Sequence, residues 1–456
     1  MKLIVENIAK VGRAELQFNG LTVIVGDNNT GKSTIGRVLF AIFHSLYEPR
    51  AAISRLRNKL FFSFAPKLSR LRHHFAPEML IRRSRELTVE ECDSILKDLD
   101  ARGRQGRDFQ VVPELVDGES SRLVERTYYV HRPFLWENES ERLQYAQLML
   151  EAARSVASCT MDNILGSVVT DELRDVFSEQ YRPLFGGEAR SPHVRIDFRE
   201  GFIEYGWNGD TSFLRSQNAA IQHDAVLVAS PLLLNAASSD FGRDALEPSH
   251  RSLINKLRRP DNSETLFKEM VRSRIAPVID VVNSHFPGNF VPSKARGGLK
   301  VDVPNLTDPL KAVNLSMGLK SFGIIKLMLE RQILHDEDVL ILDEPENHLH
   351  PEWQLAYAEA IVLLQREFGL TILLTTHSPF FLEAVQLYSA KYETNGEKRR
   401  LHVYEPVVLD LDGRIGMKEI THNEEALFGK FSKAFRDLDV VRAMIADPAN
   451  VTRRSE

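Results

Sequence analysis

The chain has 456 residues and a formal net charge of −5 at pH 7; 43% of its residues are hydrophobic and 27% are charged. This length exceeds one compact core, so we expect two or more structural units, and the weakly acidic balance excludes a chain-wide attraction to nucleic acid. The longest apolar runs are strand-sized, which argues against a membrane span. The two cysteines, Cys92 and Cys159, have no metal-ligand spacing, and free thiols predict a reducing cytoplasm.

The first fifty residues predict strands, a glycine-rich loop and a helix. A buried apolar run, Leu21 to Val25, leads into Gly26-Asp27-Asn28-Asn29-Thr30-Gly31-Lys32-Ser33, which fits G-x-x-x-x-G-K-[ST] at every fixed position. In such a loop, backbone N–H groups and the dipole of the following helix attract a phosphate. We expect Lys32 on the β- and γ-phosphates of a nucleotide and Ser33 on Mg²⁺. The predicted nucleotide contacts here are Gly26, Asn29, Thr30, Gly31, Lys32, Ser33 and Thr34.

Residues 51–190 predict a mostly helical insertion with few strand signals. Within it, residues 51–85 hold nine basic residues against one acid, Glu78, with phenylalanines interleaved. This local excess could bind a nucleic-acid backbone, dock an acidic protein, or form the solvated face of amphipathic helices whose phenylalanines point inward. The basic residues are Arg55, Arg57, Lys59, Lys67, Arg70, Arg72, Arg82, Arg83 and Arg85.

A short Ser/Gly motif, Leu315-Ser316-Met317-Gly318, precedes a predicted helix from Lys320 to Leu334. A Ser hydroxyl and a Gly backbone N–H at a helix N-terminus make an anion site. Because the chain already has a phosphate loop, we interpret Ser316 and Gly318 as contacts for the γ-phosphate held by a partner subunit.

Two later apolar strands end in chemically useful side chains. Val339 to Leu342 ends in Asp343 and Glu344, and Thr371 to Thr376 ends in His377. The carboxyl ends of such strands are where ligands of open α/β sheets bind. We expect Asp343 to hold Mg²⁺ and Glu344 to polarise the attacking water, because a carboxylate bound near Mg²⁺ is a poor base. His377 fits a residue that hydrogen-bonds the γ-phosphate, although a lone His there is more often structural.

The remaining patterns complete an α/β fold. Residues 193–206 alternate like a hairpin, and residues 337–456 alternate strand and helix, as in a parallel sheet; residues 401–420 predict a closing hairpin turned at Asp412-Gly413. The predicted fold is a P-loop NTPase with a mostly parallel sheet, flanking helices and an antiparallel β layer. Its head would comprise residues 1–50 and 191–456, ending in a hairpin and a helix, with residues 51–190 inserted.

Taken together, Gly-x-Asn-x-x-Gly-Lys-Ser, Leu-Ser-x-Gly, apolar-Asp-Glu-Pro and Thr-His-Ser-Pro resemble the heads of ABC-type ATPases. Within these, the chain is similar to the chromosome-maintenance (SMC)/RecF and overcoming-lysogenisation-defect (OLD) branch. Residues 343–354 and 376–381 are especially like OLD-type bacterial ATPases, many of which serve in phage defence. The resemblance covers residues 1–45 and 305–390 well, 190–304 loosely, and the helical insertion not at all.

The resemblance implies a homodimer or higher homo-oligomer in which ATP is sandwiched between two heads, each completing the other's site with Ser316 and Gly318. It also implies that residues 346–349 lie along the dimer interface. Met317 departs from the Gly of many members, and Gln217 and Gln222 are the candidates for the usual glutamine loop. OLD nucleases carry a C-terminal metal-dependent (TOPRIM) nuclease domain, which we do not expect in the residues that follow His377.

Three functions fit these observations. The first is an ATPase whose nucleotide-gated dimerisation controls a separate effector, a nuclease or toxin, in antiviral defence. The second is a RecF-like repair ATPase that binds DNA, and the third is a nucleotide-gated scaffold with negligible turnover. The presence of Glu344 argues for at least slow hydrolysis.

Overall fold

The computed structural model describes residues 1–71, 75–104, 108–116, 120–128, 138–185, 190–237, 248–258, 265–292, 299–393 and 401–421. The chain divides into two compact units. Unit 1, called the head below, comprises Met1–Tyr47, Asp171–Trp207 and Arg215–Glu456. Unit 2, called the insertion unit, comprises Glu48–Thr170 and Asn208–Leu214.

The head is built on an eleven-stranded sheet with the order β8-β7-β6-β1-β2-β16-β15-β3-β14-β13-β9, in which the residues Asn208–Leu214 of β7 and β8 are grouped with the insertion unit. Its continuous parallel part consists of β15, β3, β14, β13 and β9, and β16 also pairs in parallel with β2. By contrast, β1 pairs antiparallel with β2 and β6, and β6 with β7. The bounds are β1 (Lys2–Ile8), β2 (Val11–Gln17), β3 (Leu21–Val25), β6 (His193–Asp197), β7 (Phe202–Asn208), β8 (Thr211–Gln217), β9 (Ala225–Val228), β13 (Val339–Asp343), β14 (Thr371–Thr376), β15 (Leu401–Val408) and β16 (Ile415–Glu419).

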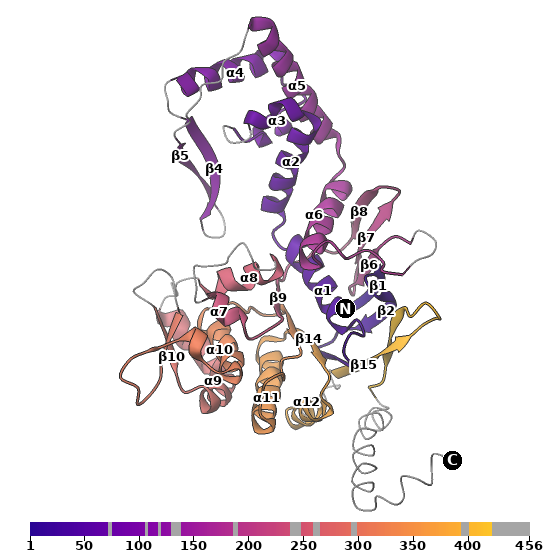
Figure 1. Ribbon diagram of the computed structural model, residues 1–456, viewed down its shortest axis with the longest axis vertical. Helices are drawn as coiled ribbons and strands as arrows, with labels where there is room; N and C mark the ends of the chain where they lie inside the picture. The colour runs from indigo at the N-terminus through magenta and orange to yellow at the C-terminus, as the bar shows by residue number, and fades with distance from the viewer. Residues whose placement is uncertain are drawn as a thin grey trace, which may run out of the picture. The chain divides into compact units, whose positions relative to one another are not determined.

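Helices cover both faces of the parallel strands, which explains why these strands are continuous apolar runs. On one face lies α1 (Lys32–Leu46), where a Cβ on Gly36 would stand 2.9 Å from Ile341 Cγ2. The alternate residues of the same strands, such as Leu340 and Leu374, join a core with the other helices, among them α11 and α12, which lie side by side (Figure 1). The further head helices are α7 (Leu233–Ala237), α8 (Pro248–Leu257), α9 (Thr265–His285), α10 (Met317–Glu330), α11 (Pro351–Phe368) and α12 (Pro379–Lys391).

A second small sheet, with the order β10-β11-β12, completes the described head: β10 (Asn289–Pro292), β11 (Leu299–Asp302) and β12 (Leu310–Lys311), followed by the short helix η3 (Ala312–Asn314). Among the described helices, none is both long and apolar enough to cross a membrane. The predicted α/β fold, with its parallel sheet, antiparallel layer and flanking helices, is thus confirmed.

The insertion unit is mainly a set of packed helices around their own core, in which α4 and α5 are in contact (Figure 1). Phe61, Phe62 and Met149 are buried in that core, and Arg142 of α5 donates to Asp93 of α4 at 2.5 Å. The elements are α2 (Arg50–Phe64), η1 (Pro66–Leu71), α3 (Glu78–Arg82), α4 (Val89–Arg104), β4 (Asp108–Val116), β5 (Ser120–Tyr128), α5 (Glu139–Ser158) and the start of α6 (Met161–Val176).

The insertion differs from its prediction in two respects. Its compact part ends at Thr170 rather than at 190, because the chain after α6 is fixed to the β1–β2 turn: Ala9 N–H donates to Tyr181 O at 2.9 Å and Leu184 N–H to Ala9 O at 3.0 Å. It also contains the hairpin β4–β5, which the mixed charge of the segment concealed. The functional division into domains stays a proposal, and the C-terminal helix predicted after the closing hairpin lies outside the described residues.

The basic segment 51–85 is partly neutralised within its own unit. Glu78 accepts from Arg57 at 3.3 Å and from Arg82 at 3.2 Å, and Glu91 accepts from Arg83 at 3.3 Å. With Phe61 and Phe62 buried, this pattern favours amphipathic helices with a solvated basic face. The side chains of Arg70 and Arg72 lie outside the described residues.

Candidate functional site

The candidate site lies where the carboxyl ends of three parallel strands meet. In the register of the sheet, Val25 at the end of β3 pairs with Thr376 of β14, and Thr375 pairs with Asp343 at the end of β13. The glycine-rich loop, the Asp-Glu pair and His377 follow these three strands directly. The fold therefore gathers the three predicted motifs at one edge of the sheet.

The loop has the backbone that its glycines predict. Gly31 has a φ of 80° immediately before α1, and a Cβ on Gly26 would stand 2.7 Å from Pro406 Cδ of β15, so each position requires glycine. Lys32 is buried, and its ammonium donates to Gly26 O at 2.7 Å and Asp27 O at 2.8 Å. Asn29, with a φ of 64°, accepts from Lys10 Nζ at 2.5 Å. The cationic end of Lys32 is thus held inside the curl of the loop.

The two acidic residues of β13 have different environments. Asp343 Oδ1 accepts from Ser33 Oγ at 2.9 Å and from Thr375 Oγ1 at 2.5 Å, so it faces the loop. Glu344 has a φ of 47°, an unfavourable region for a non-glycine residue, and its N–H donates to Thr375 Oγ1 at 3.1 Å. Its carboxylate lies 3.6 Å from Lys32 Nζ. Thr375, which sequence reasoning missed, thereby fixes both acids.

His377 stands between two carboxylates. Its Nδ1 lies 3.8 Å from Glu344 Oε2 and 3.5 Å from Glu346 Oε1, and its side chain is 41% exposed. The structure therefore brings together Lys32, Ser33, Asp343, Glu344 and His377, all of which the sequence singled out.

Glu346 is the acid that sequence reasoning did not assign to the site, since the family resemblance placed it at a dimer interface. Its side chain is 2% exposed and accepts from Thr376 Oγ1 at 2.6 Å and from the His377 N–H at 3.2 Å. Burial raises the pKa of this carboxyl above its usual value, against the opposite effect of these hydrogen bonds. Of residues 346–349, Glu346 and Leu349 are buried within the chain, whereas His348 is exposed.

The Ser/Gly motif stands apart from this cluster. Ser316 is the exposed N-cap of α10, and its Oγ accepts from Leu319 N–H at 3.4 Å. The helix begins at Met317, three residues earlier than predicted. Gly318 has a packing role of its own, because a Cβ there would stand 3.0 Å from the ring of Trp353. Any phosphate contact by Ser316 and Gly318 stays a prediction.

A cleft of about 260 Å³ opens beside the loop. Besides the loop and Glu344, it is lined by residues that no motif revealed: Ala9 and Lys10 of the β1–β2 turn, Arg37 of α1, and Phe177, Gln180 and Leu184 from the chain after α6. Of the residues described, Ser316, Gly318, Gln217 and Gln222 are not among those lining it. Gln217 ends β8, and Gln222 lies between β8 and β9.

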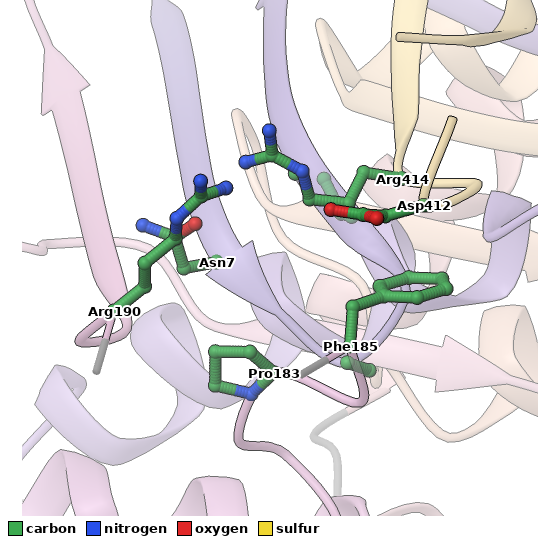
Figure 2. Close-up of a pocket in the computed structure, with 9 residues that line it drawn as sticks. Asn7, Pro183, Phe185, Arg190, Asp412 and Arg414 are labelled. Atoms are coloured by element: carbon green, nitrogen blue, oxygen red, sulfur yellow. The ribbon is translucent and has the colours of Figure 1, made fainter. Parts of the chain in front are cut away.

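A much smaller pocket of about 20 Å³, room for roughly one water molecule, lies near the closing hairpin. Figure 2 shows Asn7, Phe185, Arg190 and Arg414 around it. The Asp412-Gly413 turn beside it is a hairpin turn, as predicted: Gly413 has a φ of 81° and its N–H donates to Asp410 O at 3.1 Å. Arg414, which lines this pocket, is ion-paired with Asp410.

Comparison with known proteins places the motifs in a family context. Residues 198–383 match a protein-family model described as "AAA domain, putative AbiEii toxin, Type IV TA system". The ribosome protection protein VmlR of Bacillus subtilis (strain 168) is 31% identical over 139 residues, which is 29% of this chain and only 23% of that protein.

Two solved structures align over most of the chain at low identity. The SMC head domain from Thermotoga maritima has 10% identity and a TM-score of 0.37, covering 92% of this chain and 97% of that one. The recombination mediator protein RecF-ATPrS in the RecFOR pathway has 12% identity and a TM-score of 0.35, with the same coverage of 92% and 97%. The strand order and the motifs described above therefore carry the assignment of the fold.

The buried Glu346 makes stability depend on pH. Because its pKa is raised in the folded state, its contribution to stability is fully present below the unfolded value, near 4.5, and is lost as pH rises through the folded pKa. Glu346→Gln should therefore have a higher thermal midpoint than the parent at pH 8, and the difference should shrink as the pH is lowered towards 4.5. Thermal unfolding of both proteins across this pH range measures the difference in midpoint. If the midpoint of Glu346→Gln, relative to that of the parent, is lower at pH 8 than at pH 5, the raised pKa of Glu346 is contradicted.

Proposed function

We propose that the chain carries an ABC-type P-loop ATPase head, which binds ATP with Mg²⁺ in the cleft beside Lys32 and hydrolyses it. The observation that carries this proposal is the convergence of Lys32, Ser33, Asp343 and Glu344 at one sheet edge. The cleft continues beyond the loop to Phe177 and the residues around it, which gives the nucleoside a place to lie.

The residues present fit a magnesium ion. Ser33 Oγ and Asp343 Oδ1 are a hydroxyl and a carboxylate oxygen 2.9 Å apart, and oxygens of this kind are the ligands that Mg²⁺ prefers. These two residues would hold the ion, and bound Mg²⁺ would supply charge neutralisation to the β- and γ-phosphates. Thr375 keeps Asp343 directed at Ser33.

Glu344 is the proposed general base and His377 the residue that contacts the γ-phosphate. Lys32 has two loop carbonyls and Glu344 as partners. A γ-phosphate would take over the ammonium and leave the Glu344 carboxylate to polarise water. Asn347 Nδ2 donates to Glu344 Oε2 at 2.9 Å and so orients this carboxylate.

We further propose that two heads sandwich the nucleotide. Support comes from Ser316, which is exposed at the start of the fourteen-residue helix α10 and does not line the cleft of its own chain, as far as the described residues go. An exposed hydroxyl at a helix N-terminus is suited to the γ-phosphate of a second chain. Contact of this kind would make each site dependent on two protomers.

The biological role that fits best is the control of a separate effector, a nuclease or toxin, in antiviral defence. The resemblance of residues 343–354 and 376–381 to OLD-type ATPases supports it. The RecF-like alternative would need the basic segment 51–85 to bind DNA, and the pairing of Arg57 and Arg82 with Glu78 lowers the charge available for that.

Lys32→Ala should abolish ATP binding, because the variant loses the only described lysine whose ammonium lies within the loop. Binding of a fluorescent ATP analogue to the full chain measures this, and Lys391→Ala, at the exposed end of α12, serves as the matched control. Because the loop lysine binds the β- and γ-phosphates in P-loop NTPases, a nucleotide affinity of Lys32→Ala within about threefold of the parent would exclude the loop assignment.

Glu344→Gln should bind ATP but turn it over at least about 100-fold more slowly, as expected when a general base is lost. If two heads share the nucleotide, this variant should sediment as a larger species with ATP than without it. A mass that does not change on adding ATP would eliminate the sandwich, while leaving ATP binding by a single head intact.

A further inference from the structure

We propose that Glu346 is a positioning residue: it holds the end of β14 so that His377 keeps its place beside Glu344. This role rests on the proposed ATPase function. The buried side chain of Glu346 would fix two motifs relative to each other, the acidic end of β13 and His377.

The contacts of Glu346 converge on the turn that carries His377. One oxygen, Oε1, accepts from Thr376 Oγ1 at 2.6 Å and from the His377 backbone N–H at 3.2 Å. The same oxygen lies 3.5 Å from His377 Nδ1. A single carboxylate oxygen thus touches the backbone, the ring and the preceding side chain of the histidine turn.

A second set of contacts connects Glu346 to Glu344, the proposed general base. Glu346 belongs to the turn after β13, in which its carbonyl accepts from Leu349 N–H at 3.0 Å and the Asn347 N–H donates to Glu344 O at 3.1 Å. The Asn347 side chain also donates to Glu344 Oε2. Through this turn, Glu346 ties His377 to the same short segment that holds Glu344.

The histidine turn is fixed on its far side as well. Thr376 Oγ1, which donates to Glu346, accepts from the Ser378 N–H at 3.0 Å, and Ser378 in turn caps α12 by accepting from Phe381 N–H at 3.2 Å. The backbone at His377 therefore has anchors before and after it. Removing Glu346 would leave the anchor to α12 and the link from Thr375 to Glu344, but it would remove the acceptor for the Thr376 hydroxyl and the His377 N–H.

A carboxylate at this position lowers the stability of the fold. The side chain is almost fully buried, and within the described chain its Oε2 has no hydrogen-bond partner. Burial of a charge with one unsatisfied oxygen destabilises the fold, and an apolar residue of similar size would pack at lower cost. A functional task, rather than stability, accounts for keeping an acceptor here.

The test is a double-mutant cycle with His377. Glu346→Ala should lower kcat for ATP on the order of tenfold or more, the range typical of supporting partners of site residues, while nucleotide affinity stays within about twofold. Glu346→Gln keeps an acceptor oxygen and should retain most of the activity. In a His377→Ala background, Glu346→Ala should have an effect under about twofold, because its contribution acts through the histidine.

Two further measurements separate this role from plain packing. Thr376→Val removes the hydroxyl that donates to Glu346 and should lower kcat, whereas Thr376→Ser should keep it. Glu352→Gln makes the same chemical change as Glu346→Gln at an exposed carboxylate of α11 and should behave as the parent. Thermal unfolding of every variant shows which proteins are folded.

The outcomes distinguish this inference from the function on which it rests. If the parent neither binds nor hydrolyses ATP, the proposed function fails. If the parent is active and Glu346→Ala retains its kcat, or loses as much in the His377→Ala background as alone, the positioning role is overturned. Equal activity of Thr376→Val and Thr376→Ser would overturn it too.

Discussion

The hydrogen bond from Ser33 to Asp343 joins residues 310 positions apart, and the candidate site depends on it. Neither residue has any local reason to meet the other. They meet because β3 and β13 both flank β14 in a parallel sheet, so that their carboxyl ends share one edge. The order of these three strands is thus the constraint that turns separate motifs into one site.

The same arrangement explains how a cationic loop and several acids can coexist. Lys32 is buried with two loop carbonyls and with Glu344 as its nearest carboxylate. Thr375 holds Asp343 and the backbone of Glu344, and Glu346 holds the histidine turn. Lys32, Asp343 and Glu344 each have a partner in the protein, so binding of a triphosphate would exchange partners at these groups rather than create order from a flexible site.

The sequence indicated that Lys32, Asp343 and His377 would converge because each lies at or just after the end of a buried apolar strand, and the carboxyl ends of parallel strands share one edge. It did not predict Thr375 or Glu346, since a threonine in a strand and a glutamate in a turn are ordinary local choices. Their roles come from pairing across β13 and β14. The sequence also did not predict that Phe177 and Gln180 line the cleft, because no local pattern indicates that the chain after α6 returns to the β1–β2 turn.

We propose that Ser33 and Asp343 hold Mg²⁺ at a bound nucleotide. Calorimetric titration of ATP, with and without Mg²⁺, into the parent chain and into Asp343→Asn tests it most directly. Mg²⁺ should tighten ATP binding to the parent, and Asp343→Asn should lose this enhancement while still binding metal-free ATP through Lys32. An undiminished Mg²⁺ effect in Asp343→Asn would show that Asp343 does not hold the ion.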